Sequence, residues 1–232
     1  MRTVVIIPAF NEAESIGLVI GDLPPGMVDS VIVVNNASTD ATVRNAERAG
    51  AHVVTETRRG YGYACLRGIE EARMFTPDVI VFLDGDYSDH PDELALLLDP
   101  IRSGAADLVI GSRIAGDHEP GAMLPQALIG NRIACVLMRW FWGARYTDLG
   151  PFRAIRTEAL DALQMQDKTY GWTIEMQIKA ARLGLRIAEV PVSYRRRVGV
   201  SKITGTVSGT VKASWKILAT IFRFAVKGGA GG

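Results

Sequence analysis

The chain has 232 residues, of which 48% are hydrophobic and 22% charged, and its formal net charge is +1. This length suits one domain with a sizeable core, and the apolar content excludes an intrinsically disordered protein. The two cysteines and three histidines lack the spacing of a disulfide framework or a zinc module. No stretch reaches the roughly 20 apolar residues of a membrane span, and no signal-peptide pattern opens the chain, so we expect a cytoplasmic protein.

Charge is unevenly distributed along the chain. Ten of the 26 Lys and Arg residues, but only one of the 25 Asp and Glu residues, lie between Arg182 and the C-terminus. Such a basic tail suggests contact with phosphate, membrane lipid or nucleic acid, although a solvated helix face is the simpler alternative. The acidic first part of the chain offers no continuous basic groove, so nucleic acid is not an expected partner.

Short apolar strands alternate with helical patterns through the first half of the chain. The apolar runs predict strands at 3–8, 31–34, 52–55, 79–83 and 108–110. Helices are predicted between them at 15–23, 38–49, 63–74 and 94–101. Fully apolar strands separated by helices indicate an α/β fold with a mostly parallel sheet covered on both faces. Ligands of such sheets bind at the carboxyl ends of the strands.

The sharpest motif is Asp84-Gly85-Asp86, which directly follows a predicted buried strand. Two carboxylates separated by one glycine can converge on a single cation. Hard oxygen ligands of this kind suit Mg²⁺ or Mn²⁺, which in turn binds phosphate oxygens. The alternative is a solvated Asp-Gly turn followed by the acidic first turn of a helix that begins near Pro91. Its place after a buried strand favours the metal site.

Three further segments follow predicted strands. Asn11 and Glu12 come after the first strand, where they either form the floor of a polar pocket or cap the next helix. Asn35 and Asn36 come after the second strand, and side-chain amides there can bind the edge of a nucleobase. Residues 58–63, Arg-Arg-Gly-Tyr-Gly-Tyr, form a glycine-rich helix start suited to close backbone approach by a ligand. The glycine patterns of a dinucleotide-binding Rossmann site and of a P-loop are absent from the sequence.

In this order, the segments resemble glycosyltransferase family 2, which has the GT-A fold. The resemblance rests on Ile-Pro-Ala-Phe-Asn-Glu at 7–12, Asn-Asn-Ala-Ser-Thr-Asp at 35–40, the motif at 84–86 and Gly-Ser-Arg at 111–113. Two later segments, 147–153 and 197–202, are similar to the Asp-x-x-Ser-Gly-Phe-Arg and Arg-x-x-Gly-x-Ser-Lys segments of dolichyl- or polyprenyl-phosphate sugar synthases. We therefore expect a GT-A domain over 1–204 and an amphipathic helical tail over 205–232 with a flexible glycine-rich end.

The resemblance implies a role for each matching residue. The expected nucleotide-sugar site comprises Pro8, Ala9, Asn11, Glu12, Asn35, Asp84 and Gly85, with Asn35 at the base. Asp84 and Asp86 would bind the metal, Mg²⁺ or Mn²⁺, and through it the diphosphate. The expected catalytic residues are Asp86, Arg113, which would lie near the sugar, and Glu175. Arg153, Arg197 and Lys202 would face the acceptor and its phosphate.

Two positions depart from the family pattern. Asn35 stands where the family usually has Asp, and Gly150-Pro151 replaces the usual Ser-Gly, so the acceptor loop is expected to differ. The carbonyl of an amide can accept the N3–H of uracil, whereas the two donors of a guanine edge pair better with a carboxylate. The sequence therefore predicts a UDP-sugar rather than a GDP-sugar as donor.

The resemblance implies inverting, metal-dependent transfer of a hexose from a UDP- or GDP-linked sugar to polyprenyl phosphate. An attacking phosphate oxygen is already anionic, so it needs nearby cations rather than a strong base. With a hydroxyl acceptor, a saccharide or a small metabolite, a carboxylate must take the proton. Glu175 is the candidate for that base, and the alternative for it is an exposed helix acid. A non-catalytic nucleotide-sugar-binding protein is the remaining alternative.

Two apolar stretches carry scattered cations, at 122–142 and 210–226. Both are too charged to span a bilayer but have the composition of interfacial helices, and Trp140, Trp142 and Trp215 suit the headgroup level. We therefore expect peripheral contact with an anionic membrane surface on the cytoplasmic side. Core-packing helices or a homodimer interface are the alternatives.

Overall fold

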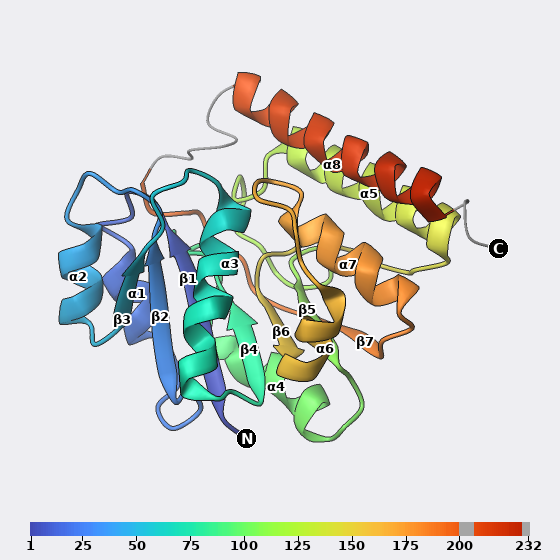
Figure 1. The fold of residues 1–232 in the computed structure, drawn as a ribbon. Helices are drawn as coiled ribbons and strands as arrows, with labels where there is room; N and C mark the ends of the chain where they lie inside the picture. Colours follow the sequence, from blue (N-terminus) through green and yellow to red (C-terminus); the bar gives the residue numbers. More distant parts are fainter. Residues whose placement is uncertain (200–206, 229–232) are drawn as a thin grey trace.

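A computed structural model describes residues 1–199 and 207–228 (Figure 1). One sheet of seven strands has the order β3-β2-β1-β4-β6-β5-β7. The strands are β1 (Thr3–Ala9), β2 (Ser30–Asn35), β3 (His52–Thr55), β4 (Val79–Phe82), β5 (Leu108–Ser112), β6 (Arg153–Arg156) and β7 (Ile187–Pro191). Among these strands only β6 runs antiparallel to its neighbours, so the expectation of a mostly parallel sheet is confirmed.

Helices cover both faces of this sheet. Side chains alternate along β1, so that Val5 and Ile7 face one layer of helices while Val4 and Ile6 face the other. The layer on Val5 and Ile7 consists of α1 (Ile16–Gly21), α2 (Thr42–Arg48) and α4 (Leu94–Arg102). The opposite layer consists of α3 (Tyr61–Ala72), α5 (Pro125–Trp142), α6 (Thr157–Leu163), α7 (Trp172–Arg182) and α8 (Val207–Gly228). Two short 3-10 helices, η1 (Arg73–Phe75) and η2 (Pro91–Glu93), complete the elements of the described ranges.

The C-terminal helix is part of the domain core. Thr220 and Ile221 of α8 are buried, and Ile221 belongs to the same apolar cluster as the strands. The expected division of the chain at residue 204 therefore separates a helix from the core that it helps to form. Among the helices in the described ranges, none combines the length and the apolarity that crossing a bilayer requires.

The topology places the polar segments at one edge of the sheet. β1, β2 and β4 are adjacent and parallel, and β5 runs in the same direction as β4 because the antiparallel β6 lies between them. The residues that follow these four strands, at 10–12, 36–40, 84–86 and 113, therefore lie at the carboxyl edge, as the sequence predicts.

Candidate active site

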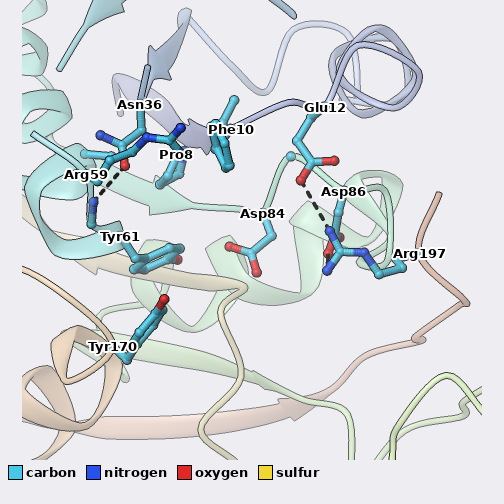
Figure 2. A pocket seen from close by; sticks show the side chains of 14 residues that line it. Pro8, Phe10, Glu12, Asn36, Arg59, Tyr61, Asp84, Asp86, Tyr170 and Arg197 are labelled. Atoms are coloured by element: carbon cyan, nitrogen blue, oxygen red, sulfur yellow. Dashed lines mark hydrogen bonds and ion pairs between the residues drawn. The ribbon is translucent and has the colours of Figure 1, made fainter. Parts of the chain in front are cut away.

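A cavity of about 260 Å³ lies at the carboxyl edge of the sheet (Figure 2). Its wall combines the turn after β1, the turn after β4 and the first turn of α3 with two residues from the C-terminal half of the chain. The lining residues are Pro8, Ala9, Phe10, Glu12, Asn36, Arg59, Gly60, Tyr61, Ala64, Asp84, Gly85, Asp86, Tyr170 and Arg197. Five of the seven residues expected to bind the nucleotide sugar are therefore in the wall, and Asn11 and Asn35 are not.

The carboxylate of Asp84, which follows β4, lacks a balancing positive charge of its own. Burial raises the pKa of Asp84 to about 7, and the negative charge of Asp86 contributes to this rise. Within residues 1–199 and 207–228, the buried Oδ1 atom of Asp84 has no hydrogen-bond partner. Two close carboxylates are both ionised at low cost only when a cation balances them. The turn at 84–86 is thus a place that attracts positive charge.

Arg197 brings one of the chain's own cations to this turn. Its Nη1 atom lies 3.1 Å from Oδ2 of Asp86, and its Nη2 atom lies 3.3 Å from Oε1 of Glu12. The backbone fixes this position, because the N–H of Val198 donates to the carbonyl of Asp86 at 3.0 Å. Figure 2 shows the guanidinium between the two carboxylates. Arg197, expected on the acceptor side, thus lies directly in the acidic part of the cavity.

The pair of carboxylates fits a divalent cation that is bound together with a phosphate ligand. In the part of the chain that the structure describes, no group of three or more His, Cys, Asp or Glu side chains is arranged to hold a metal ion. Mg²⁺ is commonly bound by only one or two carboxylates and completes its shell with substrate phosphates and water. Asp84, with its unpartnered oxygen, and Asp86 supply such a set. Lys202, the remaining cation expected near the acceptor, lies outside the described residues.

The opposite wall of the cavity carries a cation and aromatic rings. The guanidinium of Arg59 lies 3.5 Å from the ring centroid of Phe10, and Tyr61 and Tyr170 lie close by in Figure 2. Arg58 is instead paired with the buried Glu56 at 2.7 Å, and this hydrogen-bonded pairing lowers the pKa of Glu56 to about 2. Phe10 and Arg59 lie inside the segments 7–12 and 58–63 that the sequence analysis singles out, but it gives neither side chain a role. No sequence signal existed for the distant Tyr170.

The glycines at the start of α3 allow close approach by another segment of the chain, whereas the sequence predicted close approach by a ligand. A Cβ atom on Gly60 would lie 2.3 Å from the carbonyl oxygen of Lys168, and one on Gly62 would lie 2.1 Å from that of Asp167. Close backbone approach is therefore required, as predicted, but the approaching group is the chain's own 166–170 loop rather than a ligand. This loop carries Tyr170 into the cavity wall.

Asn35 and Asn36 have separate tasks. The Oδ1 atom of Asn35 accepts the N–H of Ser38 at 2.9 Å, and its Nδ2 atom donates to Thr55 at 3.4 Å. Asn36 lines the cavity, and its Oδ1 atom accepts the N–H of Gly60 at 2.9 Å. Because the amide of Asn35 is used inside the loop, Asn35 does not support the expected preference for uracil.

Asn11 also stabilises the loops around the cavity. Its backbone lies in the left-handed region, with φ of 52°, and its Oδ1 atom accepts the N–H of Thr39 at 2.8 Å. Helix α1 begins only at Ile16, with Ser15 as its N-cap residue, so Asn11 is not the helix cap that the sequence offered as an alternative. Asn11 joins the turn after β1 to the turn after β2.

Arg113 is held by a buried acid next to the cavity. Its Nε and Nη2 atoms each lie 2.8 Å from a different oxygen of Asp148, and its guanidinium carbon lies 5.0 Å from the ring centroid of Tyr194. The charge of Arg113 keeps the pKa of the buried Asp148 below its usual value against the opposing effect of burial. This bidentate pair fixes Arg113 at the carboxyl edge, outside the cavity wall, and its expected place near the sugar stays a prediction.

Arg153 does not face an acceptor. Its side chain is fully buried, and its guanidinium donates to the carbonyls of Leu149, Gly150 and Thr173. The expected acceptor role is therefore wrong in this structure, because three carbonyls occupy the donors that a phosphate would need. Arg153 instead ties β6 to the 149–150 loop and to α7.

Glu175 is neither a free base nor an exposed helix acid. Its carboxylate is 1% exposed, accepts the N–H of Asp167 at 2.6 Å and pairs with Lys179 at 2.8 Å. It also accepts the N–H of Gln166 at 3.1 Å. Glu175 is thus neither the expected base nor the alternative exposed acid. It anchors the 166–170 loop through the N–H groups of Gln166 and Asp167 and lies outside the cavity wall.

Comparison with known proteins agrees with this architecture. The family model for glycosyl transferase family 2 matches residues 4–164. An uncharacterized glycosyltransferase of Mycobacterium tuberculosis is 36% identical over 225 residues, which cover 93% of this chain and 97% of the relative. The undecaprenyl-phosphate mannosyltransferase of Micrococcus luteus is 35% identical over 225 residues, which cover 90% of each chain.

Solved structures share the whole fold. Glucosyl-3-phosphoglycerate synthase from Mycobacterium tuberculosis, in complex with Mn²⁺, UDP-glucose and phosphoglyceric acid, superposes with a TM-score of 0.79 at 26% identity. The match covers 97% of this chain and 79% of that one. Fold and cavity thus define an α/β glycosyltransferase, and the expected GT-A fold is confirmed. The chain belongs to glycosyl transferase family 2.

Proposed function

We propose that this enzyme transfers a hexose from a nucleoside diphosphate sugar to polyprenyl phosphate, with inversion at the anomeric carbon and with Mg²⁺ or Mn²⁺ as cofactor. The observation that carries the proposal is the pair Asp84 and Asp86 in the cavity at the strand ends. An oxygen of Asp84 is buried without a hydrogen-bond partner among the described residues, and Arg197 pairs with Asp86. The Micrococcus luteus relative, named as an undecaprenyl-phosphate mannosyltransferase, supports the acceptor. The neighbour with bound Mn²⁺ and UDP-glucose supports the metal and the donor.

Asp84 and Asp86 would hold the metal, which when bound neutralises the charge of the departing diphosphate. Arg197 and Arg59, on two sides of the cavity, would bind phosphate oxygens through charge-assisted hydrogen bonds. Phe10, Tyr61 and Tyr170 offer ring faces and edges for the base and sugar. These side chains orient the donor so that its anomeric carbon faces the acceptor.

In the transfer, an acceptor phosphate oxygen forms a bond to the anomeric carbon while the bond from that carbon to the diphosphate oxygen breaks. The electron pair of the broken bond leaves with the nucleoside diphosphate. No proton has to be removed, because the attacking oxygen is already anionic. This chemistry agrees with a site in which Glu175, the carboxylate expected to act as base, is already engaged by the 166–170 loop and by Lys179.

A hydroxyl acceptor is the second candidate. It is favoured by the likeness to glucosyl-3-phosphoglycerate synthase, whose structure contains phosphoglyceric acid. Such a reaction requires a carboxylate that takes the hydroxyl proton.

The purified enzyme should be incubated with Mn²⁺, a radiolabelled UDP- or GDP-hexose, and either undecaprenyl phosphate or 3-phosphoglycerate. We expect the label to enter the organic phase when undecaprenyl phosphate is the acceptor. We expect no labelled water-soluble product when 3-phosphoglycerate is the acceptor. Label found only in a water-soluble glycoside would overturn the lipid acceptor in favour of the second candidate. Donor binding without transfer to either acceptor would instead indicate a non-catalytic binding protein.

A further inference from the structure

The outer face of α5 exposes a stripe of apolar side chains. Ile129, Ile133, Val136 and Trp140 are all exposed, Trp140 to 76%. Their spacing of four, three and four residues places them on one side of the helix. The opposite side of α5 is already used, because Ala134, Cys135 and Met138 are buried in the core.

The outer face of α8 repeats this pattern. Trp215, Ala219, Phe222 and Val226 have the same spacing and are exposed, Trp215 to 73%. The inner side of α8 buries Thr220 and Ile221. Figure 1 shows α5 and α8 side by side on one flank of the molecule, and the rings of Phe141 and Phe222 lie 6.0 Å apart. The exposed residues of both helices are called the α5–α8 face below.

A helix that covers a soluble domain normally exposes its polar side. Here both helices are apolar on the side that packs inward and also on the side that faces outward. Exposed apolar side chains gathered on two neighbouring helices mark a place where another molecule can bind. The α5–α8 face is therefore suited to bind a partner.

The charges around the face indicate what that partner is. Arg132, Arg139 and Arg223 are exposed on the same helices. The ranges 125–142 and 207–228 contain no Asp or Glu at all. A symmetric interface between two copies would bring these like charges together. An anionic bilayer instead offers phosphates for the cations and an apolar layer for the stripes.

We infer that the α5–α8 face docks on the surface of an anionic membrane. The two helices lie in the plane of the bilayer, with Trp140 and Trp215 at the level of the headgroups and the arginines on lipid phosphates. The inference stands on the surface of the domain and does not depend on which acceptor the cavity serves.

Flotation with vesicles of phosphatidylcholine and phosphatidylglycerol tests this inference. We expect the wild-type protein to float with these vesicles and to bind far less to pure phosphatidylcholine. Trp140→Glu and Trp215→Glu should each weaken binding on the order of tenfold, because a carboxylate replaces a ring that would enter the bilayer and repels the anionic headgroups. The matched control is Met74→Glu on η1, where an apolar side chain is also 76% exposed, and it should float like the wild type.

Wild-type protein that stays with the soluble fraction would overturn the inference, and so would an equal loss in Met74→Glu. Dimers in light scattering that Trp140→Glu converts to monomers, without any flotation, would assign the face to a second copy. The double variant Arg132→Ala, Arg139→Ala keeps every apolar side chain and should show reduced flotation with a weaker salt dependence. Its unchanged flotation would contradict the electrostatic part of the inference.

Discussion

Buried charged side chains in the described part of the chain differ in how well neighbouring groups balance them. Arg153 donates to three buried carbonyls, Glu175 accepts N–H groups and pairs with Lys179, and Asp148 pairs with Arg113. Asp84 and Asp89 are different. Both side-chain oxygens of Asp89 are buried without a hydrogen-bond partner among the described residues, and burial, with the charges of Asp84 and Asp86, raises its pKa well above the usual value. Unbalanced buried carboxyl groups are costly, and their concentration after β4 indicates a functional rather than a structural purpose.

Arg153→Met tests the structural role of a matched charge. We expect this variant to lower the free energy of unfolding by about 3 kcal/mol, because buried carbonyls lose a charged donor. Urea denaturation measures the change. Arg73→Met is the control, since Arg73 pairs with Asp161 on the exposed surface at 3.0 Å and should cost less than about 1 kcal/mol. A stable Arg153→Met enzyme that loses only acceptor use would restore the acceptor role expected from the sequence.

The distinction between these two kinds of residue could be only partly predicted. Asp84 and Asp86 were recognisable because they directly follow an apolar strand, so local pattern alone places them at the carboxyl edge. Whether Arg153 and Glu175 have a structural role or contact a ligand depends on which carbonyls and N–H groups the tertiary fold brings to them. No local pattern contains that information, and the same side chains could equally have met a ligand.

Among the elements, α8 is connected to the cavity through the 166–170 loop. The Nζ atom of Lys216 lies 3.0 Å from Oδ2 of Asp167, whose side chain is 1% exposed. The Oδ1 atom of Asp167 accepts the N–H groups of Thr169 and Gly171, on either side of Tyr170. Helix α8 thus holds the 166–170 loop against the start of α3. Tyr170 of this loop and Tyr61 of α3 line the cavity.

Lys216→Met should therefore affect donor binding. With Asp167 left buried and without its cation, the loop loses its fixed position, and we expect the KM for the nucleotide sugar to rise on the order of tenfold. Lys216→Arg should restore most of the affinity. Steady-state kinetics and melting curves on both variants separate an effect on donor binding from an effect on the stability of the fold. An unchanged KM in Lys216→Met, with only a lower melting temperature, would show that α8 merely stabilises the fold.

Strands were predictable from the sequence where they coincide with a continuous run of apolar residues. β1, β2, β3, β4 and β5 form where apolar runs place them. β6 was missed because its sequence, Arg-Ala-Ile-Arg, contains no apolar run and becomes a buried strand only between β4 and β5. For α8, the sequence predicts the helix, but its burial against α5 and α7 depends on contacts across the fold.

The whole molecule combines two functional surfaces on one α/β domain. The carboxyl edge of the sheet holds the cavity with Asp84 and Asp86, the 194–198 segment brings Arg197 to it, and the α5–α8 face lies on one flank. In the proposed function the cavity binds a water-soluble donor, and in the further inference the α5–α8 face rests on a membrane, where a lipid acceptor would be found. At the centre of the proposed function, the two carboxylates bind a nucleoside diphosphate through a divalent cation.

Calorimetric titration of UDP and GDP in the presence of Mn²⁺ tests this claim most directly, with the wild type, Asp86→Asn and Asp92→Asn compared. Asp92 lies on η2, and its exposed side chain is outside the cavity wall, so it serves as the matched control. We predict that the wild type and Asp92→Asn bind at least one of the two nucleotides only when Mn²⁺ is present, and that Asp86→Asn binds on the order of 100-fold more weakly. Equal affinity in Asp86→Asn, or binding by the wild type that persists unchanged in excess chelator, would contradict the account.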